Sequence, residues 1–212
     1  MRRSAVALPR LYLVTPQPGD ADAPFLRDLE QALERWPRAA LLVQFRSRGL
    51  APTRWRRLAR QALACCHDHG ARLLLGAAGA PARDLDALLD AGADGVHLDS
   101  AGLLRRRGRE PPAPRLLAAS CHDLGQLQQA ARLGVDLVTL SPVLATASHP
   151  GAATLGWQGL RELCRATSLP VYALGGLQPG DLPQARAAGA QGVAAIRSLW
   201  PRQGAQTPGA TD

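Results

Sequence analysis

Three polar residues at alternate positions form a candidate anion-binding segment. Gln44, Arg46 and Arg48 alternate along "VQFRSRG", so an extended chain directs their side chains to one side. Two guanidinium groups and an amide suit a carboxylate or phosphate, which accepts charge-assisted hydrogen bonds. The alternative interpretation is an ordinary pair of surface arginines with no ligand.

A second polar group lies in "SPVLATASHPG", residues 141–151, which follows the apolar run "VDLVTL". This segment is too rich in Pro, Gly, Ala and Ser for a strand or a stable helix, so we expect a loop. It carries the hydroxyls of Thr146 and Ser148 and the imidazole of His149. Small hydroxyl donors beside a histidine suit a second polar or anionic part of a ligand.

The segment "AASCHD" supplies a candidate for proton transfer. The imidazole of His122 suits a general acid or base, and Ser120 adds a hydroxyl for ligand binding. Asp123 is interpreted as the N-cap of a helix that begins at residue 124. His97, in "GVHL", is interpreted as a hydrogen-bonded core residue, with a functional role as the alternative.

Two glycines and an arginine near the end of the chain form a candidate phosphate cradle. Gly175 and Gly176 allow the backbone to approach a ligand closely, so that its N–H groups can face a phosphate. Ile196 and Arg197 follow the next apolar run, and Arg197 can add a positive charge. These segments indicate a phosphorylated ligand.

Short apolar runs alternate with helical patterns along the chain, and these elements must position the polar residues. The predicted strands are 11–15, 41–46, 72–75, 95–98, 116–120, 137–140, 171–174 and 192–196. The predicted helices are 25–36, 52–67, 85–91, 124–133, 157–166 and 182–188. Because such alternation favours parallel strands, we predict an α/β fold, a single eight-stranded (βα)8 TIM barrel, with a doubly wound open sheet as the alternative.

A weak internal repeat supports this fold. "DAGADGVHL", "RLGVDLVTL" and "AAGAQGVAAI" each place a glycine, Gly92, Gly134 or Gly189, between a helix and a buried strand. In such a barrel the ends of the strands carry the chemistry, and the loops after strands seven and eight bind phosphate. The candidate residues named above lie near the ends of predicted strands or just after them, so we expect them at one rim.

Length and composition indicate one globular domain. Of 212 residues, we assign 1–10 to an N-terminal extension, 11–200 to the barrel and 201–212 to a disordered tail. No apolar run is long enough for a membrane span, and the N-terminus lacks a signal-peptide core, so we expect a cytoplasmic protein with no membrane partner.

The basic residues exclude some chemistry. The formal net charge is +8, and all 25 basic residues are arginine. Without lysine there is no Schiff base and no P-loop lysine. Aromatic residues make up only 4%, and no nucleic-acid-binding motif is present, so we expect no nucleic-acid partner.

The segment "CCHDH", residues 65–69, has the composition of a metal site but not its spacing. Adjacent cysteines rarely bind one zinc ion, and no second pair of ligands follows. We interpret the segment as structural, and we expect the four cysteines to be free thiols.

The chain resembles the thiamine phosphate synthase/TenI superfamily over residues 11–200. The matching segments are "VQFRSRG", "GADGVHL", "AASCHD", "LSPVLATASHPG", "LPVYALGGL" and "GAQGVAAIRSLW". Their order and spacing are specific together, and they are most similar to the barrel that follows a Nudix-type hydrolase in some bacterial proteins. The resemblance implies a (βα)8 barrel and a phosphorylated small-molecule ligand. A homo-oligomer and a Nudix-type partner enzyme are the candidate protein partners.

The resemblance also implies roles for the candidate residues. Synthases join a pyrimidine diphosphate that carries Mg²⁺ to a thiazole phosphate. Their Gln-x-Arg-x-Lys motif matches Gln44, Arg46 and Arg48, their Thr-x-Thr-Lys loop matches Thr146, Ser148 and His149, and their thiazole-phosphate cradle matches Gly175, Gly176 and residues 196–198. The chain departs from the synthases where they carry an Asn-Asp pair, because it has Gly76-Ala77 there. Asp99 is then a weak candidate metal ligand, and no metal or other cofactor is predicted with certainty.

Three functions are therefore open. TenI-type thiazole tautomerases use a histidine at the position of His122 to move a proton, and this is the leading hypothesis. A thiamine phosphate synthase with an altered Mg²⁺ and diphosphate site is the second. A non-catalytic domain that binds a phosphorylated ligand or a partner is the third.

Overall fold

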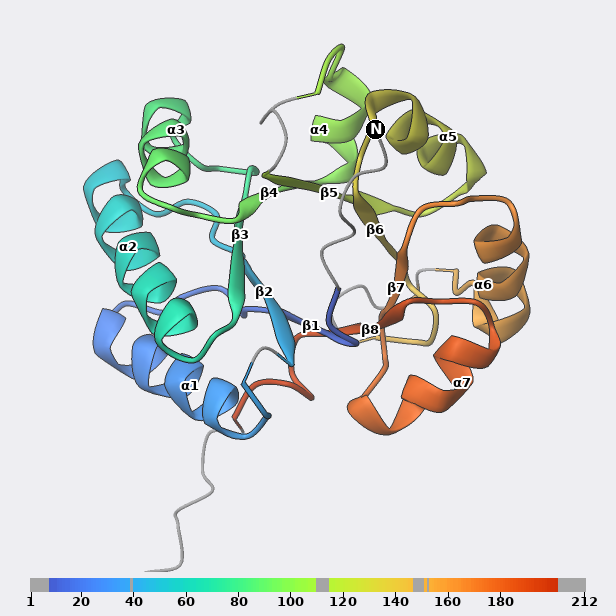
Figure 1. Ribbon diagram of the computed structural model, residues 1–212, viewed down its shortest axis with the longest axis horizontal. Helices are drawn as coiled ribbons and strands as arrows, with labels where there is room; N and C mark the ends of the chain where they lie inside the picture. The colour runs from blue at the N-terminus through green and yellow to red at the C-terminus, as the bar shows by residue number, and fades with distance from the viewer. Residues whose placement is uncertain (1–7, 39, 110–114, 147–150, 152, 202–212) are drawn as a thin grey trace, which may run out of the picture.

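Eight parallel strands close into a barrel in the computed structural model, which describes residues 8–38, 40–109, 115–146, 151 and 153–201 (Figure 1). Each strand pairs with the next along the chain, and the last pairs with the first. The predicted TIM barrel is confirmed, and the open sheet is wrong. The strands are β1 (Leu11–Val14), β2 (Leu41–Phe45), β3 (Arg72–Gly76), β4 (Gly95–Leu98), β5 (Leu116–Cys121), β6 (Leu137–Leu140), β7 (Val171–Leu174) and β8 (Gly192–Ala195).

Helices surround the barrel, as Figure 1 shows. All six predicted helices are present, with ends that differ by a few residues, and α4 was not predicted. This helix has only six residues, so its apolar pattern is too short to be distinctive. The α-helices are α1 (Asp22–Glu34), α2 (Pro52–Asp68), α3 (Ala82–Asp90), α4 (Ser100–Arg105), α5 (Leu124–Leu133), α6 (Gly156–Arg165) and α7 (Leu182–Ala187), with a 3-10 turn η1 (Pro179–Asp181) before α7.

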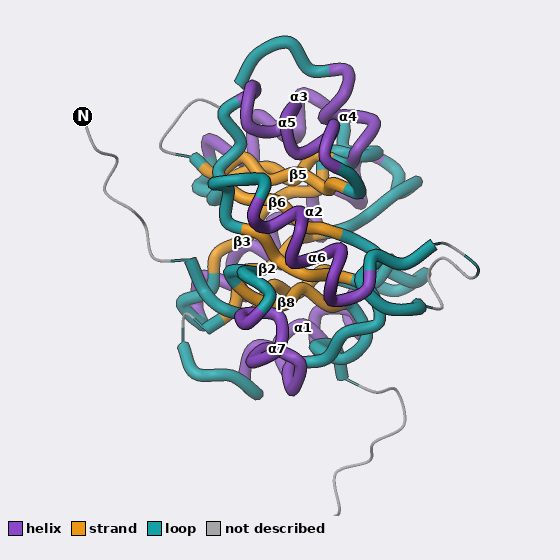
Figure 2. The backbone as a smooth tube through the Cα atoms, turned by 90° about the vertical axis from the view of Figure 1, so that its right-hand side faces the viewer, coloured by secondary structure: helices purple, strands orange, loops and turns teal. Residues whose placement is uncertain are grey.

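The strands are buried on both faces, which explains why their sequences are almost continuously apolar. In the side view of Figure 2 the strands lie inside and the helices outside. A large apolar core fills the space between strands and helices. A smaller cluster fills the barrel itself, and its buried members are Tyr12, Leu42, Leu74, Ala118, Leu137, Tyr172 and Ala194.

The internal repeat corresponds to a set of side-chain hydrogen bonds to the backbone at the amino-terminal ends of the strands. Asp94, just before β4, accepts a hydrogen bond from the N–H of Leu73 at 2.8 Å. Asp136, just before β6, accepts one from the N–H of Leu117 at 2.8 Å. Gln191, just before β8, donates to the backbone that leads into β1. One polar residue before each of β4, β6 and β8 thus ties that strand to its neighbour.

The chain after β8 packs on α1. Leu199 and Trp200 are buried, and the ring of Trp200 lies 5.3 Å from that of Phe25 between centroids. No helix in the described segments has the length and apolar character that a membrane span requires.

Candidate functional site

Two adjoining cavities open where the carboxyl ends of the strands meet. They have volumes of about 650 Å³ and about 460 Å³, and we call them the wide lobe and the narrow lobe. The wide lobe is lined by His122, Ser141, Pro142, Leu144, Thr146, Leu174, Gly175, Gly176, Leu177, Gln178, Asp181, Ala194, Ala195, Ile196, Arg197 and Ser198. The narrow lobe is lined by Val14, Gln44, Arg46, Ser47, Arg48, Gly76, Ala78, His97, Asp99, Ser100, Ser120, His122, Ser141, Leu174 and Ile196.

The structure brings the sequence-predicted residues together at this rim. Gln44, Arg46, Arg48 and Ser120 line the narrow lobe, and Thr146, Gly175, Gly176 and Arg197 line the wide lobe. His122 and Ile196 line both. Ser148 and His149 lie outside the described residues. The rule that chemistry follows the strand ends was therefore sufficient to group ten residues from the ends of five strands.

Gly175 and Gly176 bring the loop after β7 directly against the loop after β6. Both have positive φ, 102° and 69°. A Cβ on Gly175 would lie 2.8 Å from Pro142 Cα, and one on Gly176 would lie 2.5 Å from the carbonyl oxygen of Ala145. Only glycine fits such a conformation and such a contact.

Backbone donors near these glycines suit a phosphate group. The N–H groups of Gly176 and Arg197 donate to no other described part of the chain. The Ser198 hydroxyl donates to the carbonyl oxygen of Leu177 at 2.9 Å, which joins the loops after β7 and β8. With the exposed guanidinium of Arg197, this wall of the wide lobe can hold an anion.

His122 stands at the junction of the two lobes with one ring nitrogen fixed. Its Nδ1 lies 2.7 Å from the carbonyl oxygen of Ser141. A carbonyl only accepts, so Nδ1 carries the hydrogen and Nε2 keeps its lone pair. Nε2 has no hydrogen-bond partner among the described residues, which suits a general base. Asp123 accepts from the N–H of Gln126 at 2.8 Å, which confirms it as the N-cap of α5.

The backbone of the two arginines of the narrow lobe is hydrogen-bonded by residues that the sequence did not indicate. The N–H of Arg46 donates to the Thr15 hydroxyl at 2.9 Å. Gln17 accepts from the N–H of Arg48 at 2.9 Å and donates to its carbonyl oxygen at 2.7 Å. Burial, and then the nearby Arg48, lower the pKa of Arg46. An anion in this lobe would relieve the repulsion between the two guanidinium groups.

Asp99 is engaged with the protein through both carboxylate oxygens. Oδ1 accepts from the N–H of Gly102 at 2.7 Å as the N-cap of α4, and Oδ2 lies 3.8 Å from the Arg48 guanidinium. At the end of β3, a Cβ on Gly76 would lie 2.9 Å from the carbonyl oxygen of Phe45. Mg²⁺ prefers one or two available carboxylates in octahedral geometry. The described residues of the narrow lobe do not fit that donor set.

His97 lies inside the barrel below the narrow lobe. It is 2% exposed and is hydrogen-bonded through both ring nitrogens, as expected of a core histidine. Burial lowers its pKa to about 4, while the charge of Asp99 acts in the opposite direction, so the ring is neutral at pH 7. Ser47, also unpredicted, is 2% exposed in this lobe, and its hydroxyl has no partner among the described residues.

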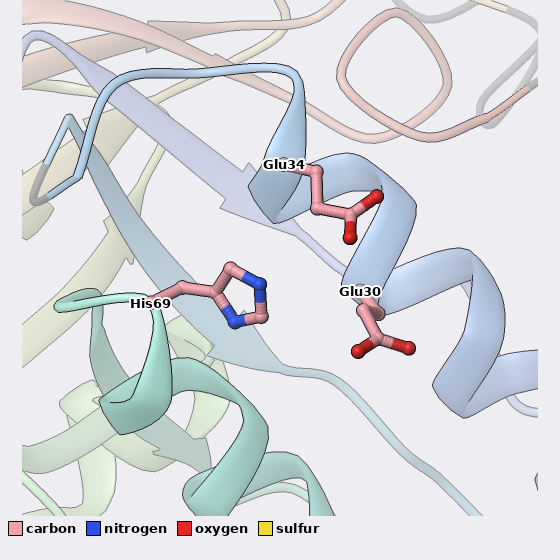
Figure 3. Close-up of side chains that lie close together, drawn as sticks. All are labelled: Glu30, Glu34 and His69. Carbon is pink, nitrogen blue, oxygen red and sulfur yellow. The ribbon is translucent and has the colours of Figure 1, made fainter.

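The segment of residues 65–69 lies at the opposite end of the barrel. Cys66 is buried, all four cysteines are free thiols, and His67 Nε2 lies 3.1 Å from Asp94 Oδ2. Figure 3 shows His69 facing Glu30 and Glu34 of α1, with ligand atoms within 4.8 Å of one another. Both glutamates are exposed, and exposed groups of this kind commonly occur without a metal.

Comparisons with known proteins match nearly the whole barrel. A family model described as thiamine monophosphate synthase matches residues 11–199. The chain is 32% identical over 189 residues to the putative thiamine-phosphate synthase 2 of Aquifex aeolicus (strain VF5), covering 89% of this chain and 96% of that protein. It is 32% identical over 192 residues to the thiamine-phosphate synthase of Synechococcus sp. (strain WH7803), covering 90% of this chain and 52% of that protein, so it spans about half of that relative.

The fold is also similar to a solved structure. The thiamine phosphate pyrophosphorylase of Pyrococcus furiosus superposes with a TM-score of 0.63 at 23% sequence identity, covering 88% of this chain and 85% of that one. At this identity the likeness concerns the barrel alone.

Proposed function

Because the chain belongs to the thiamine monophosphate synthase family, we propose that its barrel binds a phosphorylated thiazole and that His122 transfers a proton on that ring. The predicted resemblance to the thiamine phosphate synthase/TenI superfamily is thereby confirmed, and the barrel is of the thiamine-biosynthesis type. The likeness to a barrel joined to a Nudix-type hydrolase stays a prediction.

The orientation of His122 carries this proposal. Its Nδ1–H is held by the Ser141 carbonyl, which leaves the lone pair of Nε2 at the junction of the lobes. Gly176, Arg197 and His122 line the same lobe, so a ligand whose phosphate lies against the first two has its ring in the cavity that His122 also lines. Arg46, in the adjoining lobe, then suits a carboxylate on the same ring.

The proposed step needs no oxidant and no metal. Nε2 removes a proton from a ring carbon, and the bonding electrons stay in the conjugated system of the ring. The Ser141 carbonyl stabilises the resulting imidazolium through Nδ1–H. Nε2 then returns the proton to another atom of that conjugated system, so the product is a tautomer of the substrate.

Removal of His122 tests this proposal. In the His122→Ala variant we expect kcat for tautomerisation of a thiazole carboxylate phosphate to fall by a factor of 10² to 10⁴, the usual contribution of a general base, with a small change in KM. His69→Ala, at the opposite end of the barrel, is the control and should keep wild-type kinetics. Tautomerisation that persists in His122→Ala contradicts the assignment.

Thiamine phosphate synthesis is the second candidate. The names of the matched relatives favour it, and so does the row of Gln44, Arg46 and Arg48, which suits a diphosphate. The lack of a free carboxylate pair in the narrow lobe argues against it. The purified chain with aminopyrimidine diphosphate, thiazole phosphate and Mg²⁺ decides the matter. Thiamine phosphate formed only with Mg²⁺ would replace the tautomerase proposal.

A further inference from the structure

A row of hydrogen-bonded side chains runs from inside the barrel to the narrow lobe. The Tyr12 hydroxyl of β1 lies 2.8 Å from His97 Nδ1 of β4, and His97 Nε2 lies 2.9 Å from the Ser120 hydroxyl of β5. Tyr12 is fully buried, His97 nearly so, and Ser120 lines the cavity. We call these three residues the buried relay. Proton transfer at His122 makes no use of Tyr12 or His97.

The surroundings of Tyr12 fix the direction of the first hydrogen bond. Its hydroxyl lies in the apolar cluster that fills the barrel, and Tyr172, which packs edge-on against it, donates its own hydroxyl to the Pro9 carbonyl at 2.6 Å. Among the described residues His97 Nδ1 is the sole partner of the Tyr12 hydroxyl. Because a buried O–H group must donate, Tyr12 donates to Nδ1.

The directions of the other hydrogen bonds in the relay follow from that of the first. A neutral imidazole carries one hydrogen, so when Nδ1 accepts, Nε2 must donate, and its acceptor is the Ser120 oxygen. The low pKa of His97 agrees with a neutral ring. The Ser120 hydroxyl therefore cannot donate its own hydrogen to His97. Its other neighbour, the Thr139 hydroxyl, is 3.4 Å away, which is too long for a strong hydrogen bond.

We propose that Tyr12 and His97 are positioning residues that fix the Ser120 hydroxyl as a hydrogen-bond donor to an anionic oxygen in the narrow lobe. The opposite tautomer of His97 would take the Ser120 hydrogen and turn oxygen lone pairs toward the ligand, which would repel an anion. With Arg46 lining the same lobe, the lobe then recognises a phosphate, diphosphate or carboxylate oxygen that carries no hydrogen. This inference deepens the proposed function and rests on it for the ligand class.

Two tyrosine variants provide a matched test. Tyr12→Phe removes the first donor, and Tyr172→Phe removes a hydroxyl from the same cluster that donates to the Pro9 carbonyl and makes no hydrogen bond to the relay. With inorganic pyrophosphate as the probe in calorimetry, we expect Tyr12→Phe to raise Kd about tenfold or more, since a hydrogen bond to a charged group is lost. Tyr172→Phe should bind as the wild type does.

A double variant separates positioning from general damage. In a Ser120→Ala background, Tyr12→Phe should change Kd no further, because the relay acts through that hydroxyl. His97→Gln should retain most of the binding, because its amide accepts from Tyr12 and donates to Ser120, whereas His97→Leu should not. Additive effects of Tyr12→Phe and Ser120→Ala, or wild-type binding by Tyr12→Phe, would overturn the proposal.

The tautomer of His97 can be determined without any ligand. In ¹⁵N NMR spectra of the full chain we expect the His97 hydrogen on Nε2, and a hydrogen on Nδ1 would overturn the relay. Failure of the wild type to bind pyrophosphate would overturn the anionic ligand class of the lobe. Pyrophosphate binding without tautomerase or synthase turnover would support the relay and overturn the proposed function, so the two failures are distinguishable.

Discussion

Gly176 is held where a side chain has no room. Its φ is 69°, and a Cβ would meet the Ala145 carbonyl oxygen at 2.5 Å. We expect Gly176→Ala to lower the free energy of unfolding by about 1–3 kcal/mol through backbone strain, and to weaken phosphate binding because the loop after β6 must shift. Urea unfolding and calorimetry with inorganic phosphate measure the two effects.

Gly180 supplies the control for that variant. It lies in η1, with nothing within 4 Å of a built Cβ and no positive φ. Gly180→Ala should leave both quantities close to the wild type. Equal losses in the two variants would mean that the close contact at Gly176 is unimportant.

His97 makes stability depend on pH. Burial holds its pKa at about 4, against an ordinary value of 6.5 in an unfolded chain. Between these values the unfolded state binds more protons, so the free energy of unfolding falls as the pH drops from 6.5 toward 4 and is fully restored above 6.5. At pH 5 the loss from this group is about 2 kcal/mol.

His97→Gln isolates this contribution. The variant cannot titrate at position 97, so it should lose about 2 kcal/mol less than the wild type when urea unfolding is measured at pH 5.0 instead of 7.5. Parallel losses in both proteins would show that His97 is readily protonated in the native barrel.

Sequence reasoning located the residues of the rim but not their partners. Gln44, Arg46 and Arg48 were recognisable from their spacing, because the alternation of a strand is local. Tyr12 and His97 are 85 positions apart, so no local pattern indicates their hydrogen bond. The backbone groups of Arg46 and Arg48 are hydrogen-bonded by Thr15 and Gln17 from the segment after β1, and no motif in the sequence marked these two residues.

At the scale of elements, the polar residue before β4 offers a direct test. Asp94 accepts from the buried N–H of Leu73 and meets His67. Asp94→Ala leaves that N–H without an acceptor, so we expect the free energy of unfolding to fall by about 2 kcal/mol. Asp90→Ala is the control, because Asp90 is 79% exposed in its pair with Arg115 and should change stability by less than about 0.5 kcal/mol. Urea unfolding measures both variants. Equal losses of the free energy of unfolding would contradict the role of Asp94.

Helix α4 shows what the sequence concealed at this scale. Asp99 was considered as a metal ligand because it follows β4, whereas its carboxylate caps the helix that begins at the next residue. In the sequence alone, an aspartate that follows a strand is compatible with a metal ligand and with a helix N-cap. The distinction depends on the N–H group that it meets, and only the folded chain shows that group.

At the scale of the whole molecule, the barrel was predictable because every unit repeats one pattern. Each apolar run is buried on both faces, and glycine at Gly92, Gly134 and Gly189 has positive φ where a helix ends. The division of the mouth into two lobes was not predictable. The side chains that line the two lobes come from strand ends that closure of the barrel brings together.

Closure of the barrel also has a consequence while the chain is being translated. β1 pairs with β8, so Leu11 finds its neighbour Val193 only when nearly the whole barrel sequence has been translated. Until then β1 presents one unpaired edge of backbone N–H and C=O groups, and such edges recruit other strands. We expect the nascent chain on the ribosome to be the state most prone to aggregation, and slow codons between β7 and β8 to prolong that exposure.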